Sequence, residues 1–436
     1  MRALFLVAVV IAGLAATLSY PFAGVLLWTW FTCMDPHQEA YGFAQSAPFN
    51  FIIACVTIAA WLFSKERKWP PIDATFVLIC IFLAWITLNG FFAVDPAWSW
   101  PLWDRVWKTI ALGLIIMAMG TNRVRVHALV WTVVISLLYY GIKGGLFTIV
   151  TGGHYRVHGS PNSMISDNNQ LALALLMVLP LANYLRVHSA DRRLSLGFAA
   201  AMVLSTVAVI GSYSRGAFLA LVALAALAWF RSKRKVLYLL ATLAVAGPLF
   251  YFMPQSYYDR INTIQSVDVD NSFQGRLMAW KVAFGFARDH FPFGSGFAGA
   301  ERPAVFNSYL PGEKTHAAHS IYFEVLGDNG FIGLAIYLAI LAVVFRNCFR
   351  IKRLTRNNPN MAWASDMADM ILLSLFVFCV GGAALSMAYY DVFFIWAGLL
   401  SALLFHLRQA LQAQNHETGV HATAQSLSFA QSDGAL

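Results

Sequence analysis

Charged side chains are scarce in this chain, and that scarcity excludes most soluble folds. Asp, Glu, Lys and Arg make up 12% of the 436 residues, whereas roughly 25% is usual in soluble domains. Cysteine is rare as well: the five cysteines are odd in number and form no CxxC pair, so neither a disulfide framework nor a zinc knuckle is indicated. Hydrophobic residues reach 59%. This composition is that of an integral membrane protein.

The apolar residues are gathered in thirteen runs separated by polar connections. A helix needs about 20 apolar residues to cross a hydrocarbon core about 30 Å thick, and shorter runs are tolerated inside a bundle. The runs are 3–19, 21–34, 49–64, 74–93, 107–120, 126–149, 169–186, 195–212, 216–231, 236–253, 330–347, 367–387 and 390–407. The pattern predicts an all-α, polytopic membrane helix bundle.

The net charge of +9 comes from basic clusters that follow every second run. These clusters lie at 65–68, 123–125, 186–193, 231–235 and 346–356. Because cytoplasmic loops carry an excess of Lys and Arg, all five clusters are placed in the cytoplasm, and the long polar stretch before residue 330 lies on the opposite side. No recognition motif accompanies the charge, so a nucleic-acid partner is not expected.

The first two runs are separated only by Tyr20 and Pro21. Proline removes a helix hydrogen bond and disfavours helix at the preceding residue. We therefore expect a broken or half-crossing pair and about 12 transmembrane helices, with thirteen full crossings as the alternative. The chain then divides into a transmembrane bundle (1–253), a long helical loop (254–329), C-terminal transmembrane helices (330–408) and a tail of small polar residues (409–436) that we expect to be disordered and cytoplasmic.

Two arginines outside the apolar runs are candidates for binding an anion. Arg215 lies in the turn 211–216 between two spans, next to Ser214. Its guanidinium group either extends to the lipid headgroups or holds a phosphate bidentately. Arg276 precedes an apolar spacing at 277–286 that predicts an amphipathic helix, with Arg276 in its first turn. A cation there opposes the helix dipole, so a ligand anion or a nearby carboxylate is expected beside it.

Two histidines in the same loop are candidates for a general base. His316 and His319 would share a face with Glu324 if this segment were helical. Histidine titrates near neutral pH and is a natural base, although a histidine bonded to backbone at a helix start is the alternative. No HExxH pattern is present, and Asp268 and Asp270 have the character of a solvated loop, so no metal is expected.

Together these segments resemble the O-antigen ligase and O-antigen polymerase superfamily of bacterial membrane glycosyltransferases. The resemblance rests on Ser214-Arg215-Gly216, on Arg276 and Trp280 followed by the turn 292–296, on His319-Ser320 with Tyr322, Glu324, Gly327, Gly330 and Gly333, and on the entry into a span at 167–172 with Asn168 and Asn169. Many relatives have Asn after the histidine where this chain has Ser320.

The resemblance implies a ligase that takes a glycan from undecaprenyl diphosphate at the periplasmic face of the bacterial inner membrane and joins it to lipid A core oligosaccharide. Polymerases extend the glycan instead, and some relatives modify proteins. His319 is then the expected base, with His316 as the alternative, and Arg215 and Arg276 bind the diphosphate. Further contributors to substrate binding are expected among Arg288, His316, Tyr322, Glu324, Ser214, Asn168 and Asn169. No metal or other cofactor is implied.

A transporter of lipid-linked glycans is the competing class, since it would also have about twelve spans. Such a protein should place ionisable residues near the middle of the bilayer, whereas the apolar runs here are nearly free of charge. Single displacement at the anomeric carbon, with inversion, is the chemistry that the arginines and the histidine favour.

Overall fold

The computed structural model describes residues 1–40, 42–65, 67–232 and 271–432, together with the single positions 235, 236, 240, 243, 247 and 255. Within these residues every regular element is a helix and no strand occurs, so the predicted all-α class is confirmed. The predicted span 236–253 lies almost wholly outside the described residues, and Asp268 and Asp270 also lie outside them.

Each predicted apolar run in the first half of the described chain forms a helix. These helices are α1 (Arg2–Ser19), α2 (Pro21–Met34), α3 (Phe49–Phe63), α4 (Ala74–Gly90), α5 (Pro96–Met119), α6 (Arg123–Val150), α7 (Asn168–Val187), α8 (Arg192–Gly211) and α9 (Arg215–Arg231). Most begin at a side chain that accepts a first-turn N–H and so satisfies an orphan donor of the helix. The capping residues are Asp73, Asp95, Asn122, Asp167, Asp191 and Ser214.

The remaining helices are α12 (Asn271–Asp289), α13 (Pro303–Tyr309), α14 (Ile321–Thr355), α15 (Ala362–Gly382) and α16 (Asp391–Ser432). Short 3-10 turns occur at Gly42–Gln45 (η1), Gly299–Glu301 (η2) and Pro359–Met361 (η3). α14 is interrupted at Gly330, whose φ of 69° and ψ of −174° are non-helical. Glycine tolerates this conformation because it has no Cβ. The break separates a polar first part of α14 from its apolar remainder.

Seven of the described helices are long and apolar enough to cross a membrane, and three shorter apolar helices, α2, α3 and α4, accompany them. The count of about 12 crossings stays a prediction. The predicted interruption between the first two runs is present: α1 ends at Ser19 and α2 begins at Pro21.

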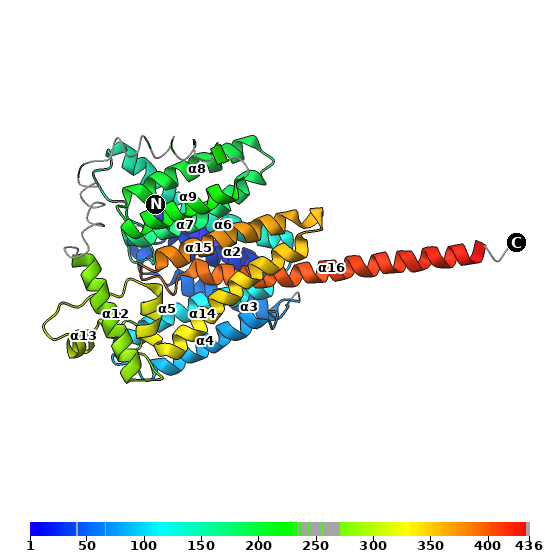
Figure 1. Ribbon diagram of the computed structural model, residues 1–436. Helices are drawn as coiled ribbons and strands as arrows, with labels where there is room; N and C mark the ends of the chain where they lie inside the picture. The colour runs from blue at the N-terminus through cyan, green and yellow to red at the C-terminus, as the bar shows by residue number, and fades with distance from the viewer. Residues whose placement is uncertain are drawn as a thin grey trace.

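The C-terminal segment differs from the expected disordered tail. α16 continues to Ser432 (Figure 1), so residues 409–432 are helical. Extending an existing helix adds a hydrogen bond with each residue and avoids the costly nucleation step. Ala and Gln recur in this stretch and are good helix formers, which explains why a polar composition did not end the helix.

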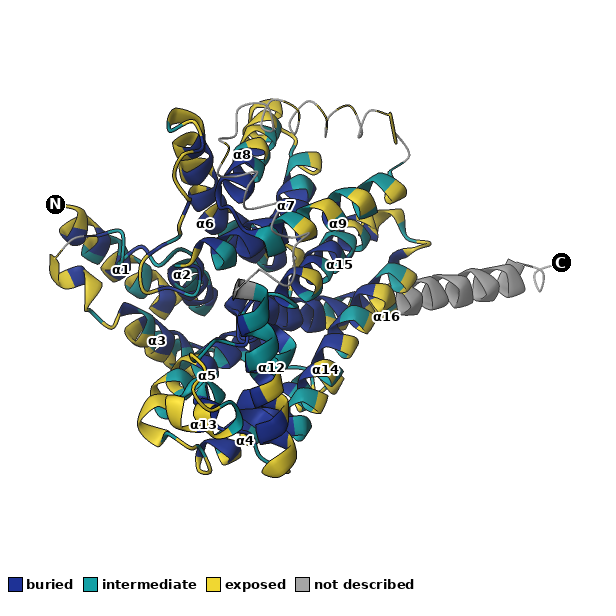
Figure 2. Cartoon of the chain, turned by 60° about the vertical axis from the view of Figure 1, so that its left-hand side comes forward, coloured by how far each residue is buried: buried dark blue, intermediate teal, exposed yellow. Residues whose placement is uncertain are grey.

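The buried core lies along α7 and α16, the helices whose apolar segments are most enclosed, whereas α1 is largely exposed. Figure 2 shows buried residues concentrated in the interior of the bundle and exposed residues on outward faces. α12 and α13 lie together at one side of the bundle in Figure 1, where α12 packs on α14. They share a small separate core of Ala279, Val282, Phe286, Val305 and Phe306. This core supports the polar segment that carries the candidate site.

Candidate functional site

The segment 315–319, which contains both predicted histidines, is not helical. α14 begins at Ile321, and the His319 backbone has a φ of 43°. His316 and His319 therefore do not share a helical face with Glu324. The left-handed region is sparsely populated by residues other than glycine, and such a conformation costs of order 1–3 kcal/mol, so it persists only where the surroundings hold it.

Three hydrogen bonds hold the backbone at His319. The indole Nε1 of Trp280 donates to the carbonyl oxygen of Ala318 at 2.6 Å, and the Ala318 amide donates to Oε1 of Glu301 at 3.2 Å. The His319 amide itself donates to Oγ of Ser386 at 3.0 Å. α12, η2 and the connection between α15 and α16 thus converge on the adjoining residues Ala318 and His319, and the side chain of His319 is exposed. The conformation of His319 is set by tertiary contacts.

α12 brings Arg276 to the same place. Gly275 packs so closely on His316 that a Cβ at position 275 would lie 2.6 Å from the imidazole Nδ1. Trp280 stacks on Phe323 with ring centroids 4.7 Å apart and an interplanar angle of 5°. The half-buried Arg276 lies in α12 between these two contacts. The helix begins earlier than the apolar spacing predicted, so Arg276 lies in its second turn.

Electrostatic coupling joins Arg276 to His319. The pKa of His319 is lowered from its ordinary value of 6.5, chiefly because the surrounding protein removes part of the hydration of the imidazole. The positive charge of Arg276 lowers the pKa further, His316 acts in the same direction, and Asp167 opposes them. A lowered pKa favours the neutral ring, which can accept a proton at neutral pH. His319 therefore has the protonation state that a general base requires.

Arg215 is the first residue of α9, directly after the capping residue Ser214. The turn before it is held by Asn168 at the start of α7, whose Nδ2 donates to the carbonyl oxygen of Ser212 at 2.6 Å. Both Asn168 and Ser212 are buried. The predicted residues Ser214 and Asn168 thus serve to shape the turn that presents Arg215.

A second contact connects α7 to the His319 segment. Gln170 donates from Nε2 to the carbonyl oxygen of Ser386 at 3.1 Å, and Ser386 accepts from the His319 amide through its hydroxyl group. The negative charge of Asp167, the capping residue of α7, also reaches His319. The N-terminal ends of α7 and α9 therefore lie at the same end of the bundle as His319, and Arg215 lies there with them.

Two of the predicted residues do not join this cluster. Arg288 is exposed and pairs with the adjacent Asp289, with Nε 2.8 Å from Oδ1. It follows Arg276 by twelve residues on α12, which is about 18 Å along a helix axis. The hydroxyl group of Tyr322 donates to the carbonyl oxygen of Cys379 at 3.1 Å and so ties α14 to α15.

The other two secondary candidates, Asn169 and Glu324, also have hydrogen-bond partners within the protein. Asn169 donates from Nδ2 to Oδ1 of Asp167 at 2.8 Å and completes the cap of α7. Glu324, in the first turn of α14, accepts from the Ala388 amide through Oε2 at 2.9 Å. Its carboxyl group thus holds the connection between α15 and α16, the same connection that carries Ser386.

Carboxyl groups gather beneath the His319 segment and bind backbone amides of three connections. Besides Glu324, the buried Asp328 accepts from the Ala298 amide at 2.8 Å and from the Tyr389 hydroxyl at 2.9 Å. Glu301 holds Ala318, as described above, and burial raises its pKa. A cavity of about 100 Å³ lies among these carboxyl groups, and Arg105 also lines it.

Glu301, Ser386 and Gln170 were not predicted from the sequence. Glu301 and Ser386 each bind the backbone of the His319 segment through one hydrogen bond, and Gln170 binds the backbone of Ser386. Such bonds leave no residue pattern near either partner. Trp280 was noted only as part of a motif. In the described part of the chain, no three His, Cys, Asp or Glu side chains gather in a way that would hold a metal ion.

An apolar helical bundle with a charged cluster at the start of α14 defines a multi-pass membrane protein that carries its candidate catalytic residues outside the apolar run. Residues 200–338 match the family model described as O-Antigen ligase, a range that contains Arg215, Arg276 and His319. This range covers about a third of the chain and supports the predicted resemblance to the O-antigen ligase superfamily, a group of membrane enzymes of the O-antigen ligase or polymerase type. Residues 1–190 match a second model, described as a family of unknown function. No curated protein matched the chain.

Proposed function

We propose that this protein is an inverting, metal-independent glycosyltransferase that moves an O-antigen glycan from undecaprenyl diphosphate to lipid A core oligosaccharide at the periplasmic face of the bacterial inner membrane. The observation that carries the proposal is the electrostatic coupling between Arg276 and His319 in a segment clamped by contacts from three elements. This coupling supports the proposal that a cation and a neutral base act on one substrate.

The two arginines act on the donor diphosphate. Transfer breaks the bond between the anomeric carbon and the diphosphate oxygen, and negative charge develops on that oxygen. Guanidinium groups bind phosphate oxygens bidentately and stabilise this charge in a site partly closed to water. Arg215 opens α9, and the partial positive charge of a helix N-terminus adds to its attraction for an anion.

His319 acts on the acceptor. A hydroxyl group of the acceptor sugar attacks the anomeric carbon while His319 removes its proton. The new carbon–oxygen bond forms on the face opposite the departing diphosphate, so the configuration inverts. The electron pair of the broken bond leaves with the diphosphate, and the proton remains on the imidazole until water takes it.

An O-antigen polymerase and a protein O-glycosylation ligase would use the same donor chemistry. They differ from the proposed ligase in the acceptor hydroxyl alone. The proposal therefore separates into a claim about the donor, which Arg215, Arg276 and His319 support, and a claim about the acceptor, which the resemblance to ligases supports.

The direct experiment incubates the purified protein in detergent with undecaprenyl-diphosphate-linked glycan and offers lipid A core, a growing glycan or an acceptor protein. We expect product with lipid A core, and we expect the same rate with EDTA present. Product only with another acceptor would reassign the acceptor, and loss of activity in EDTA that added Mg²⁺ or Mn²⁺ restores would contradict the metal-independent mechanism. Transport of the lipid-linked glycan across vesicles without covalent transfer would favour the transporter class.

The hydrogen bonds with Trp280, Glu301 and Ser386 that hold the backbone at residues 318–319, here called the clamp, predict that Ser386 is a positioning residue. Ser386→Ala removes one hydrogen bond to the His319 amide, worth about 1 kcal/mol, so kcat should fall roughly fivefold. The donor KM and the pH dependence should not change, because the hydroxyl group touches neither the proposed phosphate site nor the imidazole. Ser308→Ala is the matched control, since the Ser308 hydroxyl group donates to the carbonyl oxygen of Val305 within α13. An unchanged kcat in Ser386→Ala would show that the clamp does not set the orientation of the base.

A further inference from the structure

Four arginines form an exposed row along the last three turns of α14 and at the residue that directly follows it, Arg356. Arg346, Arg350, Arg353 and Arg356 follow one another at spacings of four, three and three residues, which places them along one side of a helix. All four are exposed, and none has an ion pair or hydrogen bond with any residue that the structure describes. Like charges at these spacings repel one another unless an anion lies between them.

The neighbouring cations, in contrast, are paired within the protein. Lys352 on the inner side of α14 pairs with Asp369 of α15. Arg231, at the end of α9, contacts the same carboxyl group at 2.5 Å. The fold thus neutralises the inward charges here, while the four outward arginines have no partner among the residues that the structure describes.

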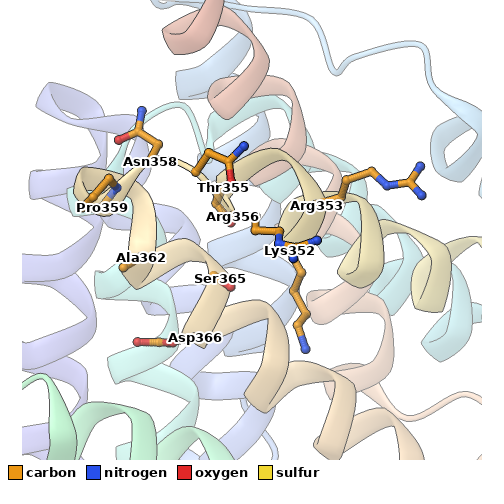
Figure 3. Close-up of a pocket in the computed structure, with 10 residues that line it drawn as sticks. Lys352, Arg353, Thr355, Arg356, Asn358, Pro359, Ala362, Ser365 and Asp366 are labelled. Atoms are coloured by element: carbon orange, nitrogen blue, oxygen red, sulfur yellow. The ribbon is translucent and has the colours of Figure 1, made fainter.

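A cleft of about 630 Å³ opens beside the end of this row, between the end of α14 and the start of α15 (Figure 3). Ligand sites in proteins measure about 300–1,000 Å³, so the volume suits a small molecule or a headgroup. Its polar lining includes Arg353, Arg356 and Asn357, whose side chains have no partner among the described residues. Asp366 is the acidic residue of this lining, and its Oδ2 lies 3.3 Å from Nε2 of His188. The cleft therefore presents donors of hydrogen bonds to an anion.

The cleft lies at the opposite end of α14 from His319. From Gly330 to Thr355 the helix runs about 37 Å at 1.5 Å per residue, which exceeds a hydrocarbon core about 30 Å thick. The arginine row begins where the apolar run of this helix ends. Phe349, 57% exposed, lies on the same side one turn before Arg353 and offers an apolar contact beside the charges.

We propose that the arginine row and the adjoining cleft bind the phosphate headgroup of an anionic phospholipid in the leaflet opposite the glycosyl-transfer site. Arg353 and Arg356 donate to the phosphate oxygens, Asn357 donates to the polar part of the headgroup, and Phe349 contacts the upper part of an acyl chain. Charge complementarity selects an anion, and continuity with the apolar surface of α14 selects a lipid over a soluble phosphate. The proposal is independent of the glycosyl-transfer function.

The test titrates the full-length protein in detergent with phosphatidylglycerol, with phosphatidylcholine and with inorganic phosphate, and follows bound ligand by native mass spectrometry. We expect phosphatidylglycerol to bind in preference to phosphatidylcholine. Each arginine near an anionic surface contributes about 1 kcal/mol, so R353Q/R356Q should weaken the binding roughly 30-fold. The control R192Q/R193Q also removes two exposed charges, at the start of α8, and should retain it.

Three results would overturn the proposal: equal affinity for the two lipids, equal losses in the two double variants, or inorganic phosphate displacing the lipid at equal concentration. The last result would assign the cleft to a soluble phosphate compound. All four substituted side chains are exposed, so both variants should keep the thermal unfolding midpoint of the unaltered protein in detergent without added lipid.

Discussion

Replacing His319 with alanine is expected to reduce glycan transfer by roughly 10²–10⁴-fold, the usual contribution of a positioned general base. The imidazole is exposed and its neighbours hold the backbone, so the variant should fold and still bind the lipid-linked donor. The measurement is the rate of transfer under saturating donor and acceptor, with donor binding determined separately. Full activity of His319→Ala would remove the proposed base.

His316→Ala is the matched control for this experiment. His316 packs against Gly275 and lines a small cavity with Glu301, whereas the side chain of His319 is exposed. We expect a modest effect at His316 and a large one at His319. The reverse ranking would assign the base to His316.

The pH dependence of the unaltered protein gives an independent reading of the same residue. Protonated imidazole cannot accept a proton, so kcat/KM should fall as the pH drops through the pKa of His319. Because that pKa is lowered from 6.5, the midpoint of the fall should lie below pH 6.5. A fall centred well above 6.5 would contradict the described environment of the ring.

Replacing Arg276 or Arg215 with glutamine is expected to reduce transfer by roughly 10²–10³-fold, as the loss of one charge-stabilising donor does in other enzymes. Lysine at either position should restore only part of the activity, because an ammonium group cannot bind phosphate oxygens in the bidentate manner of guanidinium. Arg276→Gln carries a second signature. Since the Arg276 charge lowers the pKa of His319, its removal should move the acid limb of the pH profile to higher pH.

Arg288→Gln separates this prediction from a general effect of lost positive charge. Arg288 lies on the same helix as Arg276 but pairs with Asp289 at the exposed far end, so its loss should leave transfer nearly unchanged. If the Arg288 variant loses as much activity as the Arg276 variant, the phosphate-binding role cannot be assigned to Arg276 in particular.

The sequence was sufficient for the helical class and for the placement of most helices. A helix is predicted by a run of apolar residues with Asp, Asn or Ser at its start. Both signals lie within one stretch of the chain, so a local pattern is enough to identify the helix. The tail after residue 408 was predicted wrongly because composition was weighed without the preceding helix, whose continuation to Ser432 needs no new nucleus. The number of membrane crossings stays open, since seven helices among the described residues are long and apolar enough to cross.

The candidate site, like the fold, could be predicted from the sequence only in part. Residue type alone indicated that arginine could bind a diphosphate and that histidine could accept a hydroxyl proton. Only the tertiary structure decided that His319 takes a left-handed conformation, that Trp280, Glu301 and Ser386 hold it there, and that Arg276 is coupled to it while Arg288 is not. Helix formation depends on neighbours in the chain, whereas these contacts join residues up to 67 positions apart and exist only once the helices have packed.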